Sequence, residues 1–188
     1  SLVGSEMCIR DRSQSHEFMN KLHVIYGLVD LESYDELKIY LNDILKPEKE
    51  FSHRLSLLVR NPAIAGFFIG EREKFAERKT QLLIEISPEI PNTANQEQTT
   101  HLINVYRYIH HALLLRHLPD EIIMAIDYRE QRLKTCYHIQ LKEADVRTLE
   151  SVFTENYFSQ LIEDAQGTFQ LETNEQTLSI CLETTYQE

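Results

Sequence analysis

Three polar residues near the start of the chain have the types and the spacing of a small catalytic group. Glu17 follows His16 directly, and Asn20 lies four residues after the histidine. In a helix, residues i and i+4 lie one above the other, so His16 and Asn20 would share a face. A neutral imidazole is a nitrogen nucleophile, a carboxylate can accept its other ring proton, and an amide can hydrogen-bond a phosphoryl oxygen without adding negative charge. On the polar side of a helix they are positioned for chemistry with a second macromolecule; taken alone, an exposed histidine next to a glutamate is also common on helices that carry out no chemistry.

The residues around this group predict the helix that carries it, over about residues 13–31. Apolar residues recur at intervals of four, three and four, which is the seam of a helix packed on other helices. His16 and Asn20 lie on the polar stripe of the same helix, together with His23, which would either line the phosphotransfer face or pack at a dimer seam. The apolar stripe consists of Phe18, Leu22, Ile25 and Val29.

A second amphipathic helix is predicted over about residues 34–59, with a kink or local break at Pro47. Two helices of one chain cannot bury both of these apolar stripes against each other alone. Pairing with a second copy would give a four-helix bundle, so we expect a homodimer. The alternative is that both stripes pack against the C-terminal half of the same chain.

Residues 16–28 read H-E-F-M-N-K-L-H-V-I-Y-G-L and are followed by Tyr34. This stretch resembles the dimerisation and phosphotransfer segment of two-component sensor histidine kinases, in particular the citrate and C4-dicarboxylate sensors, which share this helical domain with the sporulation phosphotransferase B family. The resemblance implies that His16 is the phosphoacceptor, that Glu17 polarises its imidazole, and that Asn20 orients the phosphoryl donor or an attacking water. It also implies a response-regulator receiver domain as the partner, docking on the first helix.

The second half of the chain predicts helices mixed with a mainly antiparallel sheet, which is an α/β sandwich. Its order resembles a shortened histidine-kinase ATPase domain. The fold class is therefore α+β, with an N-terminal helical hairpin before this sandwich. The expected elements are a helix from Pro62, a strand over 81–86, a helix over 99–117, strands over 120–128 and 133–141, a mostly helical segment over 145–165, and a hairpin of 167–173 with 176–183.

The domain boundaries follow from these patterns. Residues 1–12 resemble translated sequencing-adapter sequence, so we expect a non-native leader there. Residues 13–60 would form the dimerisation and phosphotransfer hairpin, and residues 61–188 the degenerate ATPase-like domain. The resembled sensors carry a sensing domain and membrane helices before this point. This part of the chain is thus expected to be cytoplasmic. If the intact protein has the same domain order as these sensors, it is anchored in the inner membrane.

The second half departs from the resembled kinases where nucleotide would bind. Those kinases read N-L-I-x-N-A on the helix after the first strand, whereas this chain reads R-Y-I-H-H-A, so Arg107 and His111 replace the two asparagines. Mg²⁺ prefers oxygen ligands, and imidazole is a poor substitute. The glycine-rich motifs that follow in those kinases are missing, since Gly167 is the only glycine after Gly70. We therefore expect no ATP or Mg²⁺ as cofactor.

Three functions fit this combination. The first is a histidine phosphotransferase, in which His16 takes a phosphoryl group from one receiver aspartate and passes it to another. The second is a pseudokinase that binds a response regulator as a scaffold or dephosphorylates it. The third is a divergent sensor histidine kinase that still uses ATP and Mg²⁺.

Composition excludes several other classes of function. The formal net charge of −11 disfavours nucleic acid and acidic membranes as partners. The three cysteines show no metal or redox spacing, which fits a reducing compartment, and no apolar run is long enough to span a membrane. Four histidines on one predicted helix do not share a face and lack a completing acid or cysteine, so no metal site is expected. They are His101, His110, His111 and His117.

Overall fold

The structure is a computed structural model that describes the backbone of residues 2–188 and the side chains of residues 16–47 and 49–188. The chain divides into two compact units, Ser1–Phe51 and Ser52–Glu188. The division falls inside helix α2 (Tyr34–Leu58), so the last turns of this helix belong with the second unit.

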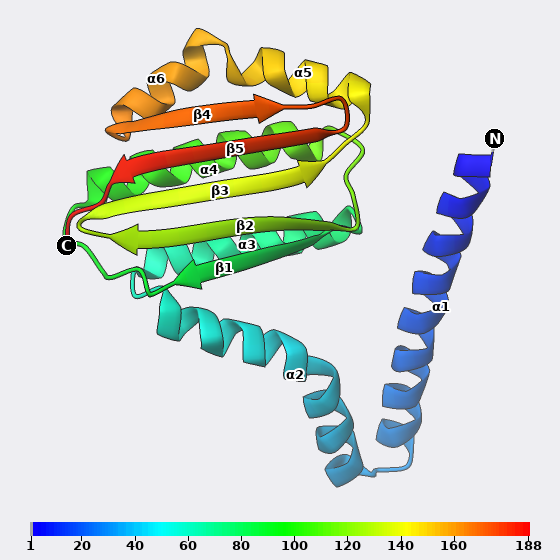
Figure 1. Ribbon diagram of the computed structural model, residues 1–188. Coiled ribbons are helices and arrows are strands. Elements are labelled where there is room, and N and C mark those ends of the chain that lie inside the picture. The colour runs from blue at the N-terminus through cyan, green and yellow to red at the C-terminus, as the bar shows by residue number, and fades with distance from the viewer. Residues whose placement is uncertain (1) are drawn as a thin grey trace. The chain divides into compact units, whose positions relative to one another are not determined.

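The first unit contains two helices joined by a tight turn, as predicted, and beyond the turn the helices diverge rather than pack along their length (Figure 1). Helix α1 (Leu2–Asp30) starts well before the predicted residue 13, and α2 continues through Pro47. The non-native leader predicted over 1–12 falls on residues whose side chains lie outside the described part of the chain.

The turn between these helices has a defined geometry. Glu32 adopts a left-handed conformation with φ of 55°, its N–H donates to the Val29 carbonyl, and the Ser33 N–H donates to the Leu28 carbonyl at 2.9 Å. These two bonds form a Schellman motif, which satisfies the last carbonyls of α1 and reverses the chain.

The second unit contains a five-stranded sheet in the order β1-β2-β3-β5-β4. β1 and β2 are parallel, and the other three pairings are antiparallel, so the predicted α+β class with a mainly antiparallel sheet is confirmed. The elements are α3 (Pro62–Glu77), β1 (Gln81–Ser87), α4 (Gln96–Leu114), β2 (Glu121–Arg129), β3 (Arg132–Gln140), α5 (Glu143–Phe153), α6 (Asn156–Asp164), β4 (Gly167–Thr173) and β5 (Thr177–Thr185).

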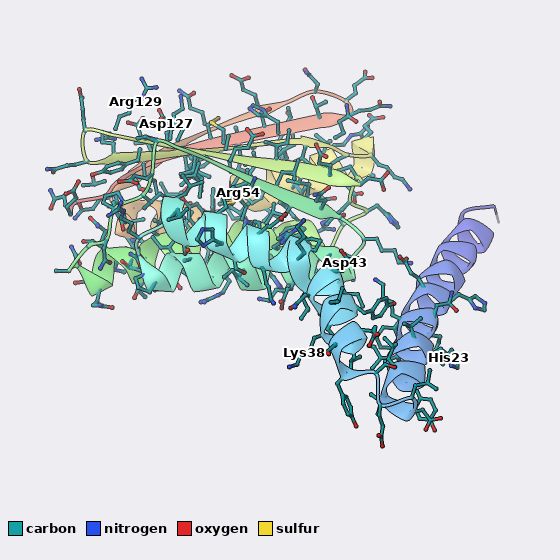
Figure 2. All side chains as sticks on the ribbon, turned by 90° about the horizontal axis from the view of Figure 1, so that it is seen from below. His23, Lys38, Asp43, Arg54, Asp127 and Arg129 are labelled. Atoms are coloured by element: carbon teal, nitrogen blue, oxygen red, sulfur yellow. A yellow bond between two sulfur atoms is a disulfide. The ribbon has the colours of Figure 1, made fainter. Side chains whose placement is uncertain are left out.

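The two faces of the sheet differ in burial. Every second residue of the central strands points toward the helices and is buried. Asp127 and Arg129 lie on the opposite face, away from α3 and α4 (Figure 2), and form an ion pair at 3.1 Å. The buried face carries Leu82, Ile122, Met124, Ile126, Leu133, Tyr137, Ile139, Leu178, Ile180 and Leu182.

One buried side chain joins distant parts of the second unit. Asn61 is 3% exposed, and its side-chain oxygen accepts from the N–H groups of Ala63 and Ile64, which caps α3. Its amide nitrogen donates to the hydroxyls of Thr99 at 3.0 Å and Tyr186 at 3.1 Å. The beginnings of α3 and α4 are thereby tied to the segment that follows β5.

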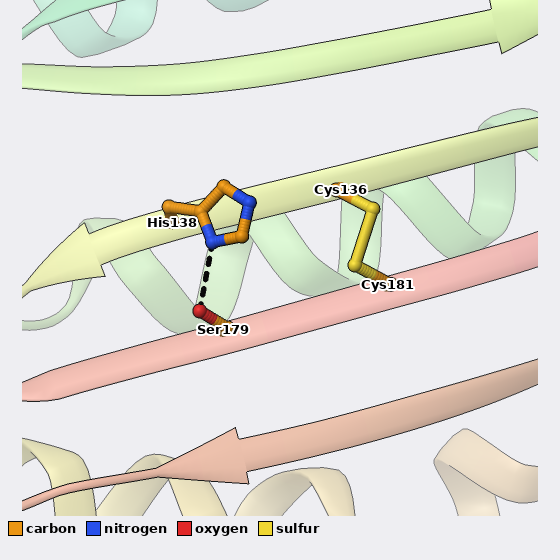
Figure 3. Close-up of a disulfide and its surroundings, with 4 residues drawn as sticks. All are labelled: Cys136, His138, Ser179 and Cys181. Carbon is orange, nitrogen blue, oxygen red and sulfur yellow. Dashed lines mark hydrogen bonds between the residues drawn. A yellow bond between two sulfur atoms is a disulfide. The ribbon is translucent and has the colours of Figure 1, made fainter.

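A disulfide joins the central strands on the face away from the helices (Figure 3). Cys136 of β3 and Cys181 of β5 are directly paired, with their Cα atoms 4.1 Å apart. The next pair on this face is His138 and Ser179, which share a hydrogen bond of 2.8 Å. The separation of 45 residues between the cysteines gave no sign of this pairing.

No helix in the described part of the chain combines the length and the apolar character needed to cross a membrane.

Candidate functional site

The three predicted phosphotransfer residues lie on α1. His16, Glu17 and Asn20 are all exposed, and the helix puts His16 and Asn20 one turn apart on the same side. An imidazole that acts on a second macromolecule has to be reachable from solvent, and His16 meets that requirement. The chemical roles of the three residues stay predictions.

The surface around this group is unusually apolar. Phe18 is 61% exposed, and Leu22 and Val29 of the predicted stripe are also exposed. Within the first unit, an open cavity of about 830 Å³ is lined by Leu28, Ile39 and charged residues of α2. Apolar patches of this kind mark surfaces that contact another molecule.

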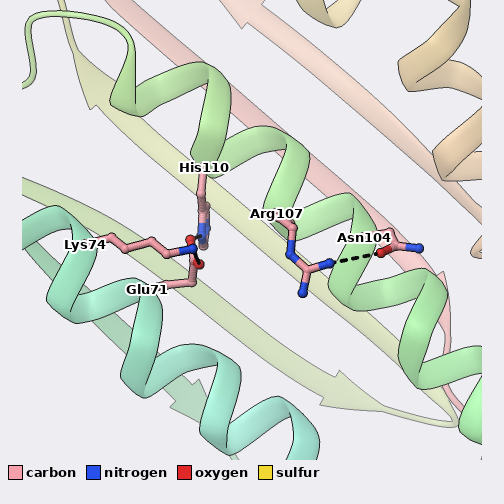
Figure 4. A network of polar contacts seen from close by, with 5 residues as sticks. All are labelled: Glu71, Lys74, Asn104, Arg107 and His110. Carbon is pink, nitrogen blue, oxygen red and sulfur yellow. Dashed lines mark hydrogen bonds and ion pairs between the residues drawn. The ribbon is translucent and has the colours of Figure 1, made fainter.

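The two residues predicted to replace the nucleotide-site asparagines lie on α4 and are exposed. The Arg107 guanidinium lies 5.7 Å from the ring centroid of Phe67 and donates to the Asn104 side chain at 3.4 Å (Figure 4). His111 lies in the last turn of α4. The Arg107 guanidinium is therefore engaged in a cation–π contact with Phe67 and in a hydrogen bond with Asn104.

The connection that follows β3 is short. β3 ends at Gln140 and α5 begins at Glu143, so only two residues connect them. Glu143 and Asp145 occupy the first turn of α5, where their negative charges would repel a phosphate. In the described part of the chain, this position has no glycine-rich loop, and the helix N-terminus that lies there carries acidic side chains.

Gly167 has a structural role. A Cβ atom at this position would lie 2.7 Å from the carbonyl oxygen of Glu183 on the paired strand β5. Glycine is needed here for the close approach of β4 to β5, so this residue is accounted for without a nucleotide.

Burial of His110 is the main feature of the second unit that the sequence did not reveal. This side chain is 0% exposed, next to the exposed His111, and its ring is stacked on Phe67 with centroids 6.0 Å apart. Its Nδ1 lies 2.8 Å from a Glu71 carboxylate oxygen, and its Nε2 lies 2.6 Å from the Tyr137 hydroxyl. The network links α3, α4 and β3, and Figure 4 shows its part between α3 and α4, with Glu71, Lys74 and His110.

The charges of this network follow from its surroundings. Burial lowers the pKa of His110, against the opposing effect of the Glu71 carboxylate, so the imidazole is neutral. Because a carboxylate can only accept, Nδ1–H donates to Glu71 and the Tyr137 hydroxyl donates to Nε2. Burial would raise the pKa of Glu71, but bonding to His110 and to Lys74, 3.0 Å away, outweighs it and lowers that pKa. Burial also raises the pKa of Tyr137, so its hydroxyl keeps its proton.

The histidines of α4 do not come together as a ligand set. His110 is committed to Glu71 and Tyr137, and His101 lies 3.6 Å from Glu97. Among the described residues, no three histidine, cysteine or carboxylate side chains are placed to hold a metal ion.

Comparison with known proteins gives the relationships of the chain. Residues 8–57 match the α-helical domain of the SpoOB-type sensor kinases. The chain is 36% identical over 95 residues to the sensor histidine kinase DcuS of Escherichia coli (strain K12), and 34% identical over 74 residues to a probable C4-dicarboxylate sensor kinase of Halalkalibacterium halodurans. It is 28% identical over 94 residues to the sensor protein CitS of Bacillus subtilis (strain 168).

These matches cover only part of each protein. The match to DcuS includes 49% of this chain and 17% of that protein. The corresponding shares are 39% and 14% for the C4-dicarboxylate sensor kinase, and 50% and 17% for CitS. Among solved structures, the catalytic domain of the histidine kinase ThkA aligns with a TM-score of 0.51 and 13% identity, covering 65% of this chain and 89% of that domain. This last likeness concerns the fold alone.

Proposed function

Because the chain belongs to the two-component sensor histidine kinases of the citrate and C4-dicarboxylate type, with a SpoOB-type α-helical domain, we propose that His16 accepts a phosphoryl group from one receiver aspartate and donates it to another. The observation that carries this proposal is the exposed His16, with Glu17 beside it and Asn20 one turn away on α1. A surface imidazole can receive an in-line phosphoryl group from an aspartyl phosphate without any change in the fold.

Each of the three residues has a distinct task in this reaction. One ring nitrogen of His16 attacks phosphorus, and the receiver aspartate leaves as a carboxylate. Glu17 accepts a hydrogen bond from the other ring nitrogen, which fixes the tautomer and stabilises the imidazolium that forms. The Asn20 amide donates to a phosphoryl oxygen and orients the group without charge repulsion. The reverse reaction delivers the phosphoryl group to a second receiver.

The homodimer expected from the sequence is part of the proposal. Phe18 and Leu22 are exposed in the first unit, and the cavity beside Ile39 is open. A second copy of the hairpin would cover these side chains in a four-helix bundle and leave the polar side of α1 to the receiver.

The second unit is proposed not to bind ATP. This is supported by Arg107 and His111 on α4, by the two-residue connection after β3, and by the acidic first turn of α5. Guanidinium and imidazole groups do not supply the oxygen ligands that Mg²⁺ requires, and the acidic turn disfavours a phosphate.

Transfer from a radiolabelled phosphorylated receiver domain tests the proposal. We expect an acid-labile, alkali-stable label on the wild-type protein, and none on His16→Gln. The matched control is His53→Gln, which removes another exposed histidine and should leave labelling unchanged. Absence of label on the wild type with every cognate receiver would overturn the proposal.

Two further measurements separate the alternatives. Glu17→Ala should slow transfer by about 10²- to 10⁴-fold without dissociating the dimer; a monomeric variant would show that Glu17 is structural. Calorimetric titration with ATP and Mg²⁺ should show no binding. Micromolar binding, with labelling of His16 from ATP, would favour a divergent kinase.

A further inference from the structure

The pair Cys136 and Cys181 lies at the centre of the sheet face that the helices leave uncovered (Figure 3). Its neighbours across the strands are Ala125 of β2, opposite Cys136, and Gln170 of β4, opposite Cys181. Both neighbours are short or uncharged, and both cysteines are partly exposed. A small thiol can therefore approach the sulfur atoms from solvent.

The arrangement of the strands does not depend on the bond. β3 and β5 pair continuously from Arg132–Thr185 to Gln140–Thr177, and alternate residues such as Tyr137 and Ile180 are fully buried on the other face. A shift by one residue would turn that apolar face to solvent, so burial alone fixes the register. The two sulfur atoms thus stay within bonding reach whether or not they are oxidised.

Charged and polar side chains lie beside the pair on the uncovered face of the sheet. Lys134 and His138 flank it two residues away on the same face of β3. Lys134 is paired across the strands with Asp127 of β2 and Glu183 of β5, and Glu183 also contacts Arg132 at 2.6 Å. Positive charge next to a sulfur makes it the better leaving group, and Lys134 is the lysine placed to act on Cys136 in this way.

We propose that Cys136 and Cys181 form a reversible redox-modification site, opened and closed by exchange with low-molecular-mass thiols and disulfides of the glutathione type. In the opening direction, an external thiolate attacks Sγ of Cys181, and Cys136 leaves as a thiolate. A second external thiolate then attacks the external sulfur of the mixed disulfide and releases Cys181. Two external thiols are oxidised to one disulfide, and their two protons end on the two cysteines.

The closed bond restrains a defined part of the second unit. Residues 136–181 include α5, α6 and β4, so oxidation ties both ends of this segment together. A cross-link of this loop length lowers the entropy of the unfolded chain and stabilises the folded one. The oxidised protein should therefore resist thermal unfolding more than the reduced protein does.

The test uses the full chain in a Cys8→Ser background, so that only the pair can react. The protein is equilibrated under native conditions with graded ratios of reduced to oxidised glutathione, quenched with acid, and alkylated for mass spectrometry. We expect both thiols to appear together in one transition that moves with the ratio. We also expect the oxidised form to melt about 5–10 °C above the reduced form.

Three results would overturn the proposal: a pair that stays reduced at every ratio, a bond that native reduction does not open, or a mixed disulfide that persists. The charge argument has its own readout. Lys134→Gln should slow reduction several-fold, whereas Gln140→Ala at the far end of β3 should not change it. Equal rates in the wild type and both variants would contradict the role of Lys134.

Discussion

Many large apolar side chains of the first unit face solvent, whereas most of those in the second unit face one another. Phe18 and Ile39 are 61% and 70% exposed, while Phe68 and Phe158 are 0% exposed. His16 of the first unit is exposed, and His110 of the second unit is fully buried. The second unit therefore has an apolar core of its own, and the first unit presents apolar surface of the kind that contacts another molecule.

The largest expected effect is a cavity in the second unit. Phe68→Ala removes a fully buried ring between α3 and α4, where it lies 5.8 Å from Tyr106. We expect the free energy of unfolding of this unit to fall by about 3–5 kcal/mol. Urea unfolding followed by circular dichroism measures it, and a loss below about 1 kcal/mol would show that the unit is less tightly packed than described.

Removal of the buried imidazole should rank second. His110→Leu leaves the Glu71 carboxylate and the Tyr137 hydroxyl without their shared partner, so we expect a loss of about 2–4 kcal/mol in the same assay. The neighbouring exposed residue is the control, because His111→Leu should change stability by less than about 0.5 kcal/mol. Equal effects of the two substitutions would refute the network.

The third effect is a pH dependence. Because burial lowers the pKa of His110, the unfolded chain binds a proton near the ordinary value of 6.5 and the folded chain does not. The stability of the second unit should therefore decrease as the pH falls below 6.5, by up to about 1.4 kcal/mol for each unit of the pKa difference. The pH-dependent decrease should be smaller in His110→Gln; an unchanged profile would assign it to other groups.

The smallest effect on the second unit should come from the hairpin. Phe18→Ser is expected to change the unfolding free energy of the second unit by less than about 0.5 kcal/mol while dissociating the proposed dimer in sedimentation equilibrium. Leu115 is equally exposed but lies in the second unit, so Leu115→Ser should leave the dimer intact. Loss of second-unit stability in Phe18→Ser would break the contrast between the two units.

Local patterns predicted the elements well, and their ends less well. The strands expected over 120–128 and 133–141 are Glu121–Arg129 and Arg132–Gln140. The turn between them consists of Glu130 and Gln131, with φ of 50° and 60°. The predicted strands already placed the turn between residues 128 and 133, although Glu-Gln is not the Asn-Gly pair that such a two-residue turn normally uses.

Among the candidate functional residues, those close together in the sequence could be predicted, and those brought together only by the fold could not. His16, Glu17 and Asn20 lie within five consecutive positions, so a contiguous pattern could single them out, and their roles stay predictions. His110 and Glu71 are 39 residues apart, and the two bonded cysteines are 45 apart. These pairs form only when the sheet and its helices assemble, and no spacing rule within a single sequence encodes them.

The position of β5 has a consequence for how the protein is made. β5 is the last strand of the unit in the chain, yet it lies inside the sheet between β3 and β4. The hydrogen bond from Asn61 to Tyr186 cannot form until 125 further residues have been synthesised. During synthesis, the helices α1 and α2 can therefore form soon after they emerge from the ribosome. The sheet, in contrast, cannot be completed until almost the whole second unit has emerged, and until then its unpaired strand edges are exposed and available to a chaperone.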